Sequence, residues 1–358
     1  MYSERIVKLK ELMKEKNLEQ LLVTDTASIF YLTGRWIEAG ERLLVLLVRP
    51  SGKPVLFINE LFPEKESDDL DFVWIKDTTD SISLLAEKLE KEKVLGIDKN
   101  WPSGFLIRLM ETTGSTRYVN SSLLLDLIRS QKDEEEIRFM KEASKLNDDA
   151  MTMLIDAIHE DMTEKEMEER LREIYETLGA DGFSFTPIIA YGKNGANPHH
   201  ENSHRLLKEG DSIILDIGCR KDNYASDMTR TVFYVELDEK AGEVYETVLE
   251  ANRKAIEMVK PGVRFSDIDK AAREVIEQKG YGEFFTHRTG HSIGIEVHEY
   301  GDVSSVNDDV LKPGMIFSVE PGIYLEGELG VRIEDLVLVT EEGHEVLNRY
   351  PKDLQVIY

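Results

Sequence analysis

Acidic residues embedded in otherwise apolar, strand-forming segments restrict the possible folds of this 358-residue chain more than any other feature. Asp216 follows the apolar run 213–215, and Glu334 stands shortly before the apolar run 336–339. A carboxylate inside an apolar strand is costly to bury unless it is paired or bound to a metal ion. The fold must therefore gather these acids around a cation, or keep some of them protonated.

The first acid pair is predicted in a β-hairpin over residues 212–234, where two strand-like runs flank a polar turn around Asp222. If the turn is centred between Lys221 and Asp222, Asp216 and Asp227 lie directly opposite one another. Their Cβ atoms would then be roughly 5 Å apart. A register shift of two residues keeps both acids on one face of the sheet, whereas a shift of one residue separates them.

A second hairpin over residues 315–339 repeats this arrangement. Glu320 and Glu334 are equidistant from Gly327, which lies in a glycine-containing turn. Two hairpins with opposed acids predict two structurally related halves that together close one site. The segment between the hairpins contains His291 and so adds an imidazole nitrogen to that site.

Four carboxylates and one histidine form an oxygen-rich ligand set, which favours a pair of Mn²⁺, Co²⁺ or Fe²⁺ ions over a thiolate-type zinc site. Two such ions, about 3.5–4 Å apart, can share bridging carboxylates and a bridging water whose pKa falls towards neutrality. The predicted chemistry is hydrolysis of an acyl or phosphoryl bond. Taken singly, each acid could be an ordinary turn or surface residue. The apolar segments that surround these acids favour the metal site.

The length of the chain predicts two domains. Residues 1–128 alternate helical and strand patterns, which predicts a layered α/β domain. Its strands are expected at 20–24, 43–48, 55–58, 72–75 and 94–97, with one helix capped by Ser3 and another over 80–91. Residues 129–358 form the second predicted domain. It opens with helices at 134–159 and 163–178, the latter with a capping box of Thr163 and Glu166.

Composition argues against several classes of partner. The net charge of −26 repels phosphate backbones and disfavours nucleic-acid binding. No run approaches the roughly 20 apolar residues of a membrane-spanning helix, so no membrane association is expected. A single cysteine, Cys219, and an N-terminus without an apolar signal-peptide core favour a cytoplasmic protein. Cys219 itself is expected to pack in a strand rather than to act as a nucleophile.

Residues 200–204, His-Glu-Asn-Ser-His, match the H-E-x-x-H pattern of zinc proteases. That pattern binds zinc only on a helix, where both histidines share one face. Here it follows Asn197-Pro198 and lacks an apolar helical period. We therefore reject a zinc site at this segment.

Five short motifs surround the candidate ligands: Leu-Asp216-Ile-Gly, Ser-Asp227-Met-Thr-Arg, Gly-His291-Ser-Ile-Gly, Val-Glu320-Pro-Gly and Arg332-Ile-Glu334-Asp. Together they resemble the pita-bread metallopeptidases, the group of prolidase, aminopeptidase P and methionine aminopeptidase. The resemblance covers residues 130–358 and implies an α+β pita-bread catalytic domain with two related halves. Methionine aminopeptidases generally lack an N-terminal α/β domain, so its presence here favours prolidase or aminopeptidase P.

The resemblance implies a role for each ligand. Asp227 and Glu334 would bridge two divalent ions per subunit, expected to be Mn²⁺ or Co²⁺, with Fe²⁺ and Zn²⁺ as alternatives. Asp216 would complete the coordination of one ion, and His291 and Glu320 that of the other. Glu320 would also be the proton shuttle, which takes a proton from the nucleophilic water and passes it to the leaving nitrogen.

Two histidines match positions of the family outside the ligand set, and Arg332 is a further candidate. His199, in Ala-Asn-Pro-His, is expected to contact the substrate near the scissile bond or the proline, and His298 to stabilise the tetrahedral oxyanion. Both could instead be loop histidines hydrogen-bonded to the backbone. Arg332 shares a strand face with Glu334, and either holds a carboxylate ligand in place or binds the substrate's terminus.

The stretch from Tyr31 to Leu44 resembles a segment of bacterial prolidases that leads into a loop reaching the partner's active site in a homodimer. Trp36, Glu41 and Arg42 are therefore candidates for shaping a substrate pocket. An ordinary surface loop is the alternative. On this basis we expect a homodimer.

Amide chemistry and the resemblance together predict the substrate. A peptide bond to proline is a tertiary amide without an N–H, and a metal site that polarises the carbonyl directly does not need that N–H. The leading hypothesis is a cytoplasmic, homodimeric Xaa-Pro dipeptidase. The alternatives are an aminopeptidase P that acts on longer peptides and a non-catalytic binding protein of the same fold.

Overall fold

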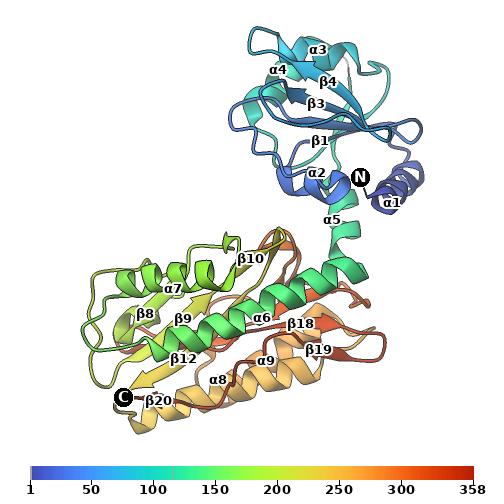
Figure 1. The fold of residues 1–358 in the computed structure, drawn as a ribbon. Helices are drawn as coiled ribbons and strands as arrows, with labels where there is room; N and C mark the ends of the chain where they lie inside the picture. The colour runs from blue at the N-terminus through green and yellow to red at the C-terminus, as the bar shows by residue number, and fades with distance from the viewer. Residues whose placement is uncertain (1, 115) are drawn as a thin grey trace. The chain divides into compact units, whose positions relative to one another are not determined.

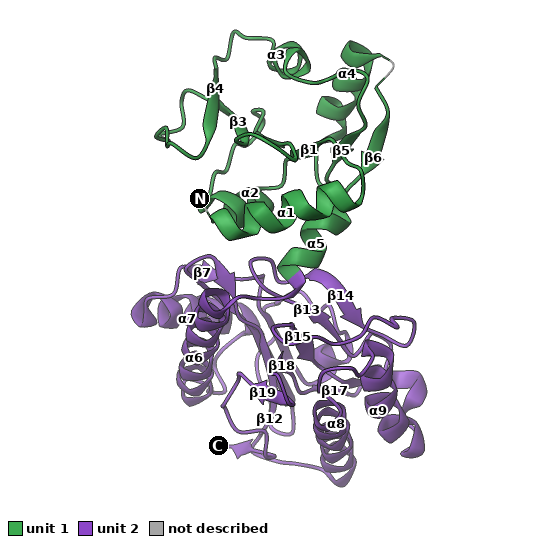
Figure 2. Ribbon diagram, turned by 90° about the vertical axis from the view of Figure 1, so that its right-hand side faces the viewer, with its two compact units in different colours: residues 1–129 green, residues 130–358 purple. Residues whose placement is uncertain are grey.

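The computed structural model describes residues 2–114 and 116–358 (Figure 1). The chain divides into two units, residues 1–129 and residues 130–358 (Figure 2). The division falls in the last turn of α5 (Ser122–Ser130). Each unit has a hydrophobic core of its own.

The N-terminal unit is built on a six-stranded mixed sheet with the order β4-β3-β2-β1-β5-β6. Its strands are β1 (Gln20–Val23), β2 (Val45–Val48), β3 (Val55–Asn59), β4 (Asp71–Ile75), β5 (Leu95–Ile97) and β6 (Tyr118–Asn120). Besides α5, its helices are α1 (Ser3–Glu15), α2 (Thr26–Thr33), α3 (Ser81–Glu87) and α4 (Ser103–Thr113). The layered α/β architecture predicted for this part of the chain is confirmed.

The five strands predicted here are present, with ends shifted by one or two residues. Two details were wrong. Ser3 is the first helical residue of α1, and Tyr2 occupies the N-cap position, where its side chain forms no capping hydrogen bond. The helix predicted over 80–91 ends at Glu87. Helix α2 was not predicted because nearly every residue in it is buried, so its sequence lacks the amphipathic period that marks a surface helix.

The C-terminal unit consists of two halves with one arrangement, a helix pair packed with a mainly antiparallel sheet (Figure 1). In the first half, α6 (Glu134–Asp156) and α7 (Glu164–Leu178) share a core with β8 (Ile188–Tyr191), β9 (Ser212–Ile217) and β12 (Met228–Tyr234). In the second half, α8 (Glu239–Glu257) and α9 (Phe265–Gln278) share a core with β15 (Ile316–Val319) and β18 (Asp335–Val339). The two related halves predicted from the acid pairs are therefore present.

The remaining elements of this unit complete its sheets. They are β7 (Gly182–Phe183), η1 (Gly192–Ala196), β10 (Cys219–Lys221), β11 (Tyr224–Ala225), η2 (Gly282–Phe284), β13 (Gly290–Ser292), β14 (Glu299–Val303), β16 (Gly322–Leu325), β17 (Leu329–Arg332), β19 (His344–Val346) and β20 (Val356–Ile357). The main sheets have the orders β20-β12-β9-β8 and β14-β13-β15-β18-β19. Helix α7 begins with the predicted capping box of Thr163 and Glu166. Among the described residues, no helix combines the length and the apolar character needed to cross a membrane.

The register of the first acid-bearing hairpin differs from the predicted one. Asp216 pairs with Thr229 rather than with Asp227. The turn is centred between Asp222 and Asn223, which both adopt positive φ angles of 51° and 67°. Asp and Asn tolerate this left-handed conformation and favour a two-residue turn of this kind. The acids therefore lie diagonally on the same face, the arrangement expected for a shift of two residues.

The second hairpin has the predicted register. Val319 pairs with Asp335 in β15 and β18, and Gly322 pairs with Arg332 in β16 and β17. Glu320 and Glu334 lie between these two pairs and therefore face one another across the hairpin.

The C-terminal segment joins the two halves. β20 adds to the first-half sheet as a parallel partner of β12. The guanidinium of Arg230, in β12, donates to the carbonyl oxygen of Tyr350 (2.8 Å) and to Oδ1 of Asp335 (2.8 Å). Lys352 donates to the other oxygen of Asp335 at 2.5 Å. Since Asp335 begins β18, residues 350–357 tie the first sheet to the second.

Candidate metal centre and substrate pocket

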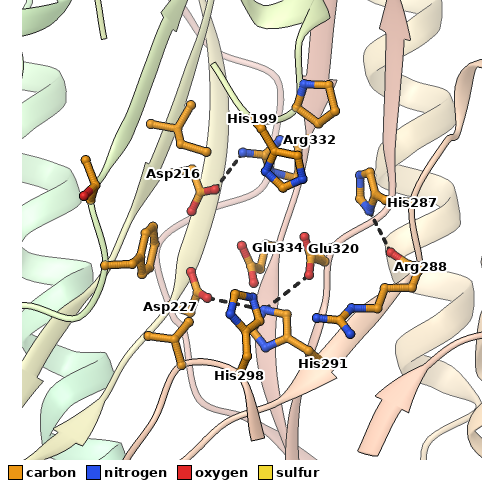
Figure 3. Close-up of a pocket in the computed structure, with 15 residues that line it drawn as sticks. His199, Asp216, Asp227, His287, Arg288, His291, His298, Glu320, Arg332 and Glu334 are labelled. Carbon is orange, nitrogen blue, oxygen red and sulfur yellow. Dashed lines mark hydrogen bonds and ion pairs between the residues drawn. The ribbon is translucent and has the colours of Figure 1, made fainter. Parts of the chain in front are cut away.

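The predicted ligands converge where the two halves meet (Figure 3). Asp227, His291 and Glu334 are buried, and one ligand atom from each lies within 4.8 Å of the others. Nε2 of His291 is 3.6 Å from Oδ2 of Asp227 and 3.4 Å from Oε1 of Glu320. Asp216 lines the same cavity. The fold thus brings all five sequence-predicted ligands into one cavity.

Three buried carboxylate oxygens in this cluster have no hydrogen-bond donor among the described residues: Oδ1 of Asp216, Oδ1 of Asp227 and Oε1 of Glu334. The second oxygens of Asp216 and Glu334 accept hydrogen bonds from Arg332 (2.6 Å) and Thr229 (2.7 Å). A buried charged oxygen without a donor is strongly unfavourable, whereas divalent cations bind such oxygens. The donor set therefore fits divalent metal ions.

Burial and mutual repulsion control the protonation of this cluster. Burial, reinforced by the charges of Glu334 and Asp216, raises the pKa of Asp227 well above its usual range. Burial and the charge of Glu320 do the same to the pKa of Glu334. Burial also raises the pKa of Glu320 to about 7 and lowers the pKa of His291 to about 3. His291 is therefore neutral, as a metal ligand must be.

The metal-free protein is expected to lose stability as the pH rises from about 5 to about 8. Carboxyl groups of the unfolded chain ionise at about pH 4, whereas folded Glu320 keeps its proton until about pH 7. Asp227 and Glu334 also have raised pKa values. In this interval the folded state binds more protons than the unfolded state, so the free energy of unfolding falls as the pH rises. Thermal denaturation of the protein after its metal ions have been removed with a chelator measures the effect.

Asp227→Asn is the control for this pH dependence, because asparagine carries no charge at any of these pH values. The metal-free variant should show a flatter dependence of melting temperature on pH. Adding Mn²⁺ to the native protein at pH 8 should restore the lost stability. A native metal-free protein whose melting temperature is constant or rises over this interval contradicts the expectation.

A directional chain of hydrogen bonds begins at Asp216. Arg332, 3% exposed, donates to Oδ2 of Asp216 (2.6 Å) and to the hydroxyl of Tyr324 (2.9 Å). Because a guanidinium only donates, Tyr324 accepts there and directs its own proton to Nε2 of His287, at 2.8 Å. His287 then donates from Nδ1 to the carbonyl oxygen of Arg288, at 2.7 Å. Desolvation lowers the pKa of His287 to about 4, which keeps its ring neutral, as this series of hydrogen bonds requires.

The ligand cluster opens into a cavity of about 560 Å³, a size typical of small-molecule sites. His199 and His298 both line it (Figure 3). The ring of His298 packs against that of His291, with centroids 4.3 Å apart, and desolvation lowers its pKa. The other residues that line the cavity outside the ligand set and Arg332 are Phe185, Thr186, Ile188, Pro198, His287, Arg288 and Val297.

Several residues of the site were missed in the sequence. Ser318 donates to Oε1 of Glu320 at 3.2 Å. Because it precedes Glu320 by two residues, the alternation of side chains along a strand could have placed it on the same face. Tyr324 lies diagonally from Arg332 across β16 and β17. The alternation of side chains in the paired strand could therefore also have placed it on the face of Arg332. His287 lies outside any strand or helix, and no local pattern singles it out.

Residues 200–204 and Cys219 have the local structure that was predicted for them, outside a helix and packed in a strand respectively. Residues 200–204 are all described and form no helix, and Nε2 of His200 lies 2.8 Å from a carboxylate oxygen of Glu164. Cys219 is fully buried in the core of the first half, and burial raises its pKa to about 11. Neither feature contributes to the cavity.

Trp36 and Arg42 belong to the N-terminal unit, whereas the residues that line the cavity all belong to the C-terminal unit. Trp36 packs edge-to-face on Phe30, with ring centroids 5.7 Å apart. Nε of Arg42 lies 2.9 Å from Oδ1 of Asp77. Their role in a substrate pocket stays a prediction.

Two family models match the chain. Residues 138–341 match Metallopeptidase family M24, and residues 5–131 match the Creatinase/Prolidase N-terminal domain. The first range lies within the C-terminal unit, and the second covers almost all of the N-terminal unit.

Individual proteins match over nearly the full length. An uncharacterized peptidase of Staphylococcus aureus is 35% identical over 359 residues, which covers 97% of this chain and 100% of that protein. A prolidase structure from Thermococcus sibiricus has a TM-score of 0.94 and 34% identity, over 100% of this chain and 99% of that one. An X-Pro aminopeptidase from Thermotoga maritima has a TM-score of 0.84 and 31% identity, over 95% of this chain and 98% of that one. These matches confirm the predicted fold class, an α/β N-terminal domain followed by a pita-bread domain.

Proposed function

Because the chain belongs to metallopeptidase family M24, we propose that it is an Xaa-Pro dipeptidase, which hydrolyses the peptide bond before a C-terminal proline. The observation that carries the proposal is the cavity of about 560 Å³ in which the five candidate ligands, His199 and His298 meet. Its size suits a dipeptide or a short peptide. The similarity to the prolidase of T. sibiricus supports the same activity.

The proposed cofactors are two divalent ions per subunit, Mn²⁺ or Co²⁺, with Fe²⁺ and Zn²⁺ as alternatives. Asp216, Asp227, His291, Glu320 and Glu334 are the proposed ligands. The three carboxylate oxygens without donors support this assignment. Bound ions would polarise the scissile carbonyl and lower the pKa of a water molecule.

The protein's own residues would move the protons and hold the substrate. Oε1 of Glu320 accepts a hydrogen bond from Ser318, which leaves Oε2 to take a proton from the attacking water and pass it to the leaving nitrogen. His298 would donate a hydrogen bond to the developing oxyanion. His199 would contact the substrate near the scissile bond, and Arg332 would keep Asp216 oriented.

The apolar part of the cavity suits a proline ring. Phe185, Ile188, Pro198 and Val297 contribute apolar surface to its wall. Proline's amide nitrogen carries no hydrogen, so the site needs no acceptor for a substrate N–H at the scissile bond. The leaving group is a secondary amine, which must receive a proton as the bond breaks. Glu320 is the group proposed to supply it.

We also propose a homodimer in which Trp36 and Arg42 shape the pocket of the partner subunit. The resemblance of residues 31–44 to the corresponding segment of bacterial prolidases supports this assembly. Light scattering tests it, and a mass equal to that of one 41.0-kDa chain would contradict it.

The dipeptide Ala-Pro is expected to have a kcat/KM at least about tenfold higher than that of the tripeptide Ala-Pro-Ala. The terminal carboxylate of a dipeptide can accept a charge-assisted hydrogen bond inside the cavity, worth about 1.5–3 kcal/mol, and about 1.4 kcal/mol corresponds to tenfold. Ala-Ala is the control for the proline requirement and should be cleaved more slowly than Ala-Pro. Chromatographic detection of released alanine measures all three rates.

Two other functions correspond to distinct outcomes of these measurements. Equal or faster cleavage of Ala-Pro-Ala would select the Xaa-Pro aminopeptidase alternative, which the similarity to the T. maritima enzyme favours. Absence of heat on titrating the chelated protein with Mn²⁺ and Co²⁺ would select a non-catalytic binding protein.

A further inference from the structure

Glu164, the first residue of α7, is a fully buried carboxylate that does not line the cavity. Its two oxygens accept five hydrogen bonds. Oε1 accepts from the backbone N–H of Tyr191 (2.9 Å) and from Nδ2 of Asn194 (2.8 Å). Oε2 accepts from Nε2 of His200 (2.8 Å) and from both the N–H (2.9 Å) and the hydroxyl (2.6 Å) of Ser203. Burial alone would raise the pKa of Glu164, but these hydrogen bonds hold it below its usual value.

All five donors belong to residues 191–203, and this segment also supplies His199 to the cavity. It comprises the end of β8, the short helix η1 and a stretch without regular secondary structure. The segment therefore lacks the continuous backbone ladder that would fix a strand or a long helix. Its conformation depends on side-chain hydrogen bonds, and Glu164 accepts from residues on both sides of His199.

The adjacent histidines of this segment have different partners. His200 is hydrogen-bonded to Glu164, whereas His199 lines the cavity (Figure 3). The backbone between them is held by a turn at Asn197, whose side-chain oxygen accepts from the N–H of His199 (3.0 Å) and whose carbonyl accepts from that of His200 (3.1 Å). Anchoring His200 and Ser203 on Glu164 therefore fixes the direction in which His199 points.

We propose that Glu164 is a positioning residue, which holds residues 192–203 in the conformation that presents His199 to the cavity. The proposal rests on the proposed function in so far as His199 contacts the substrate. It also explains the H-E-x-x-H match without a metal ion, because His200 and Ser203 of that motif serve as donors to a buried carboxylate. The third residue of α7, Glu166, is not involved, since it forms the capping box with Thr163.

The test compares Glu164→Gln with Glu169→Gln in the full-length, metal-loaded protein. Glu169 lies on the same helix, with a side chain 71% exposed beside Arg172. A glutamine at position 164 keeps one acceptor oxygen, but its NH₂ group replaces the other oxygen and cannot accept the hydrogen bonds made there. Hydrogen exchange of residues 192–203 should accelerate at least about tenfold in Glu164→Gln. The kcat/KM for Ala-Pro should fall about 10–100-fold, as for groups that orient functional residues. Glu169→Gln should change neither quantity.

A double-mutant cycle separates positioning from a general loss of stability. In a His199→Ala background, Glu164→Gln should lower kcat/KM by less than about threefold, because the residue that it positions is absent. An equal loss in both backgrounds, or unchanged exchange of residues 192–203, would overturn the proposal. If Glu164→Gln does not fold, Ser203→Ala removes one donor and should change both quantities in the same direction by a smaller factor.

The hydrogen-exchange measurement does not depend on peptidase activity. A protein that cleaves no Xaa-Pro peptide would contradict the proposed function, and exchange of residues 192–203 in Glu164→Gln would still decide whether Glu164 holds this segment.

Discussion

Asp227→Asn is expected to lower kcat/KM for Ala-Pro by at least about 10³-fold, because bound metal ions supply several kcal/mol of transition-state stabilisation. Asp227 is 4% exposed, and its Oδ1 has no donor among the described residues. An amide of the same shape cannot supply the charge that balances a divalent cation. Enzyme kinetics with measurement of bound metal by mass spectrometry should show loss of both activity and metal.

Asp222→Asn is the matched control, since it removes the same charge from the same hairpin. Asp222 is an exposed turn residue with a φ of 51°, and asparagine tolerates that conformation equally well. Its activity should stay close to that of the native protein. Metal-free Asp227→Asn should unfold at a higher temperature than the metal-free native protein at pH 8, because it buries one fewer unpaired charge. Loss of activity with full metal content would disprove a ligand role for Asp227.

Arg332→Met is expected to lower the free energy of unfolding by about 3–5 kcal/mol, the usual result of removing one partner of a buried ion pair. Arg332 is 3% exposed, and its contact with Asp216 is 2.6 Å long. Without it, both oxygens of Asp216 would lack a donor. The kcat/KM should fall about 10–100-fold as well, because Asp216 loses the group that orients it. Urea denaturation and steady-state kinetics measure the two effects.

Two further variants show how much of this loss of stability comes from the contact between Arg332 and Asp216. Tyr324→Phe keeps the contact of Arg332 with Asp216 and removes the hydroxyl that connects to His287, so its stability should fall by only about 1–3 kcal/mol. Arg253→Met removes an exposed arginine 3.4 Å from Asp353, a pair expected to contribute less than about 1 kcal/mol. Equal stabilities of Arg332→Met and Arg253→Met would show that Arg332 does not support Asp216.

The comparison of the two hairpins shows what local sequence determines. Around Glu320 and Glu334, the glycine-containing turn at Gly327 is compatible with one register, and the prediction was correct. Around Asp216, the turn lies one position later than predicted because Asp222 and Asn223 both accept positive φ. The alternation of side chains still kept both acids on one face. The face of the sheet on which a residue lies can therefore be predicted from the sequence more reliably than the residue with which it pairs.

Contacts between distant segments could not be predicted in this way. The chain from Arg332 through Tyr324 to His287 requires knowledge of how a hairpin packs against a loop. The five donors to Glu164 could not be predicted from the sequence either, since they come from a segment more than two dozen residues later in the chain. Helix α2 illustrates a different limit, because an element buried on all sides carries no amphipathic signal.

The seam formed by residues 350–357 has a consequence for synthesis on the ribosome. The acids of the first half are translated more than a hundred residues before this seam, and β12 gains its outer partner only when β20 has emerged. Until then, Arg230 lacks the carbonyl of Tyr350, and Asp335 lacks Lys352. Until residues 350–357 have been synthesised, the two halves of the catalytic unit would therefore lack this link between their sheets.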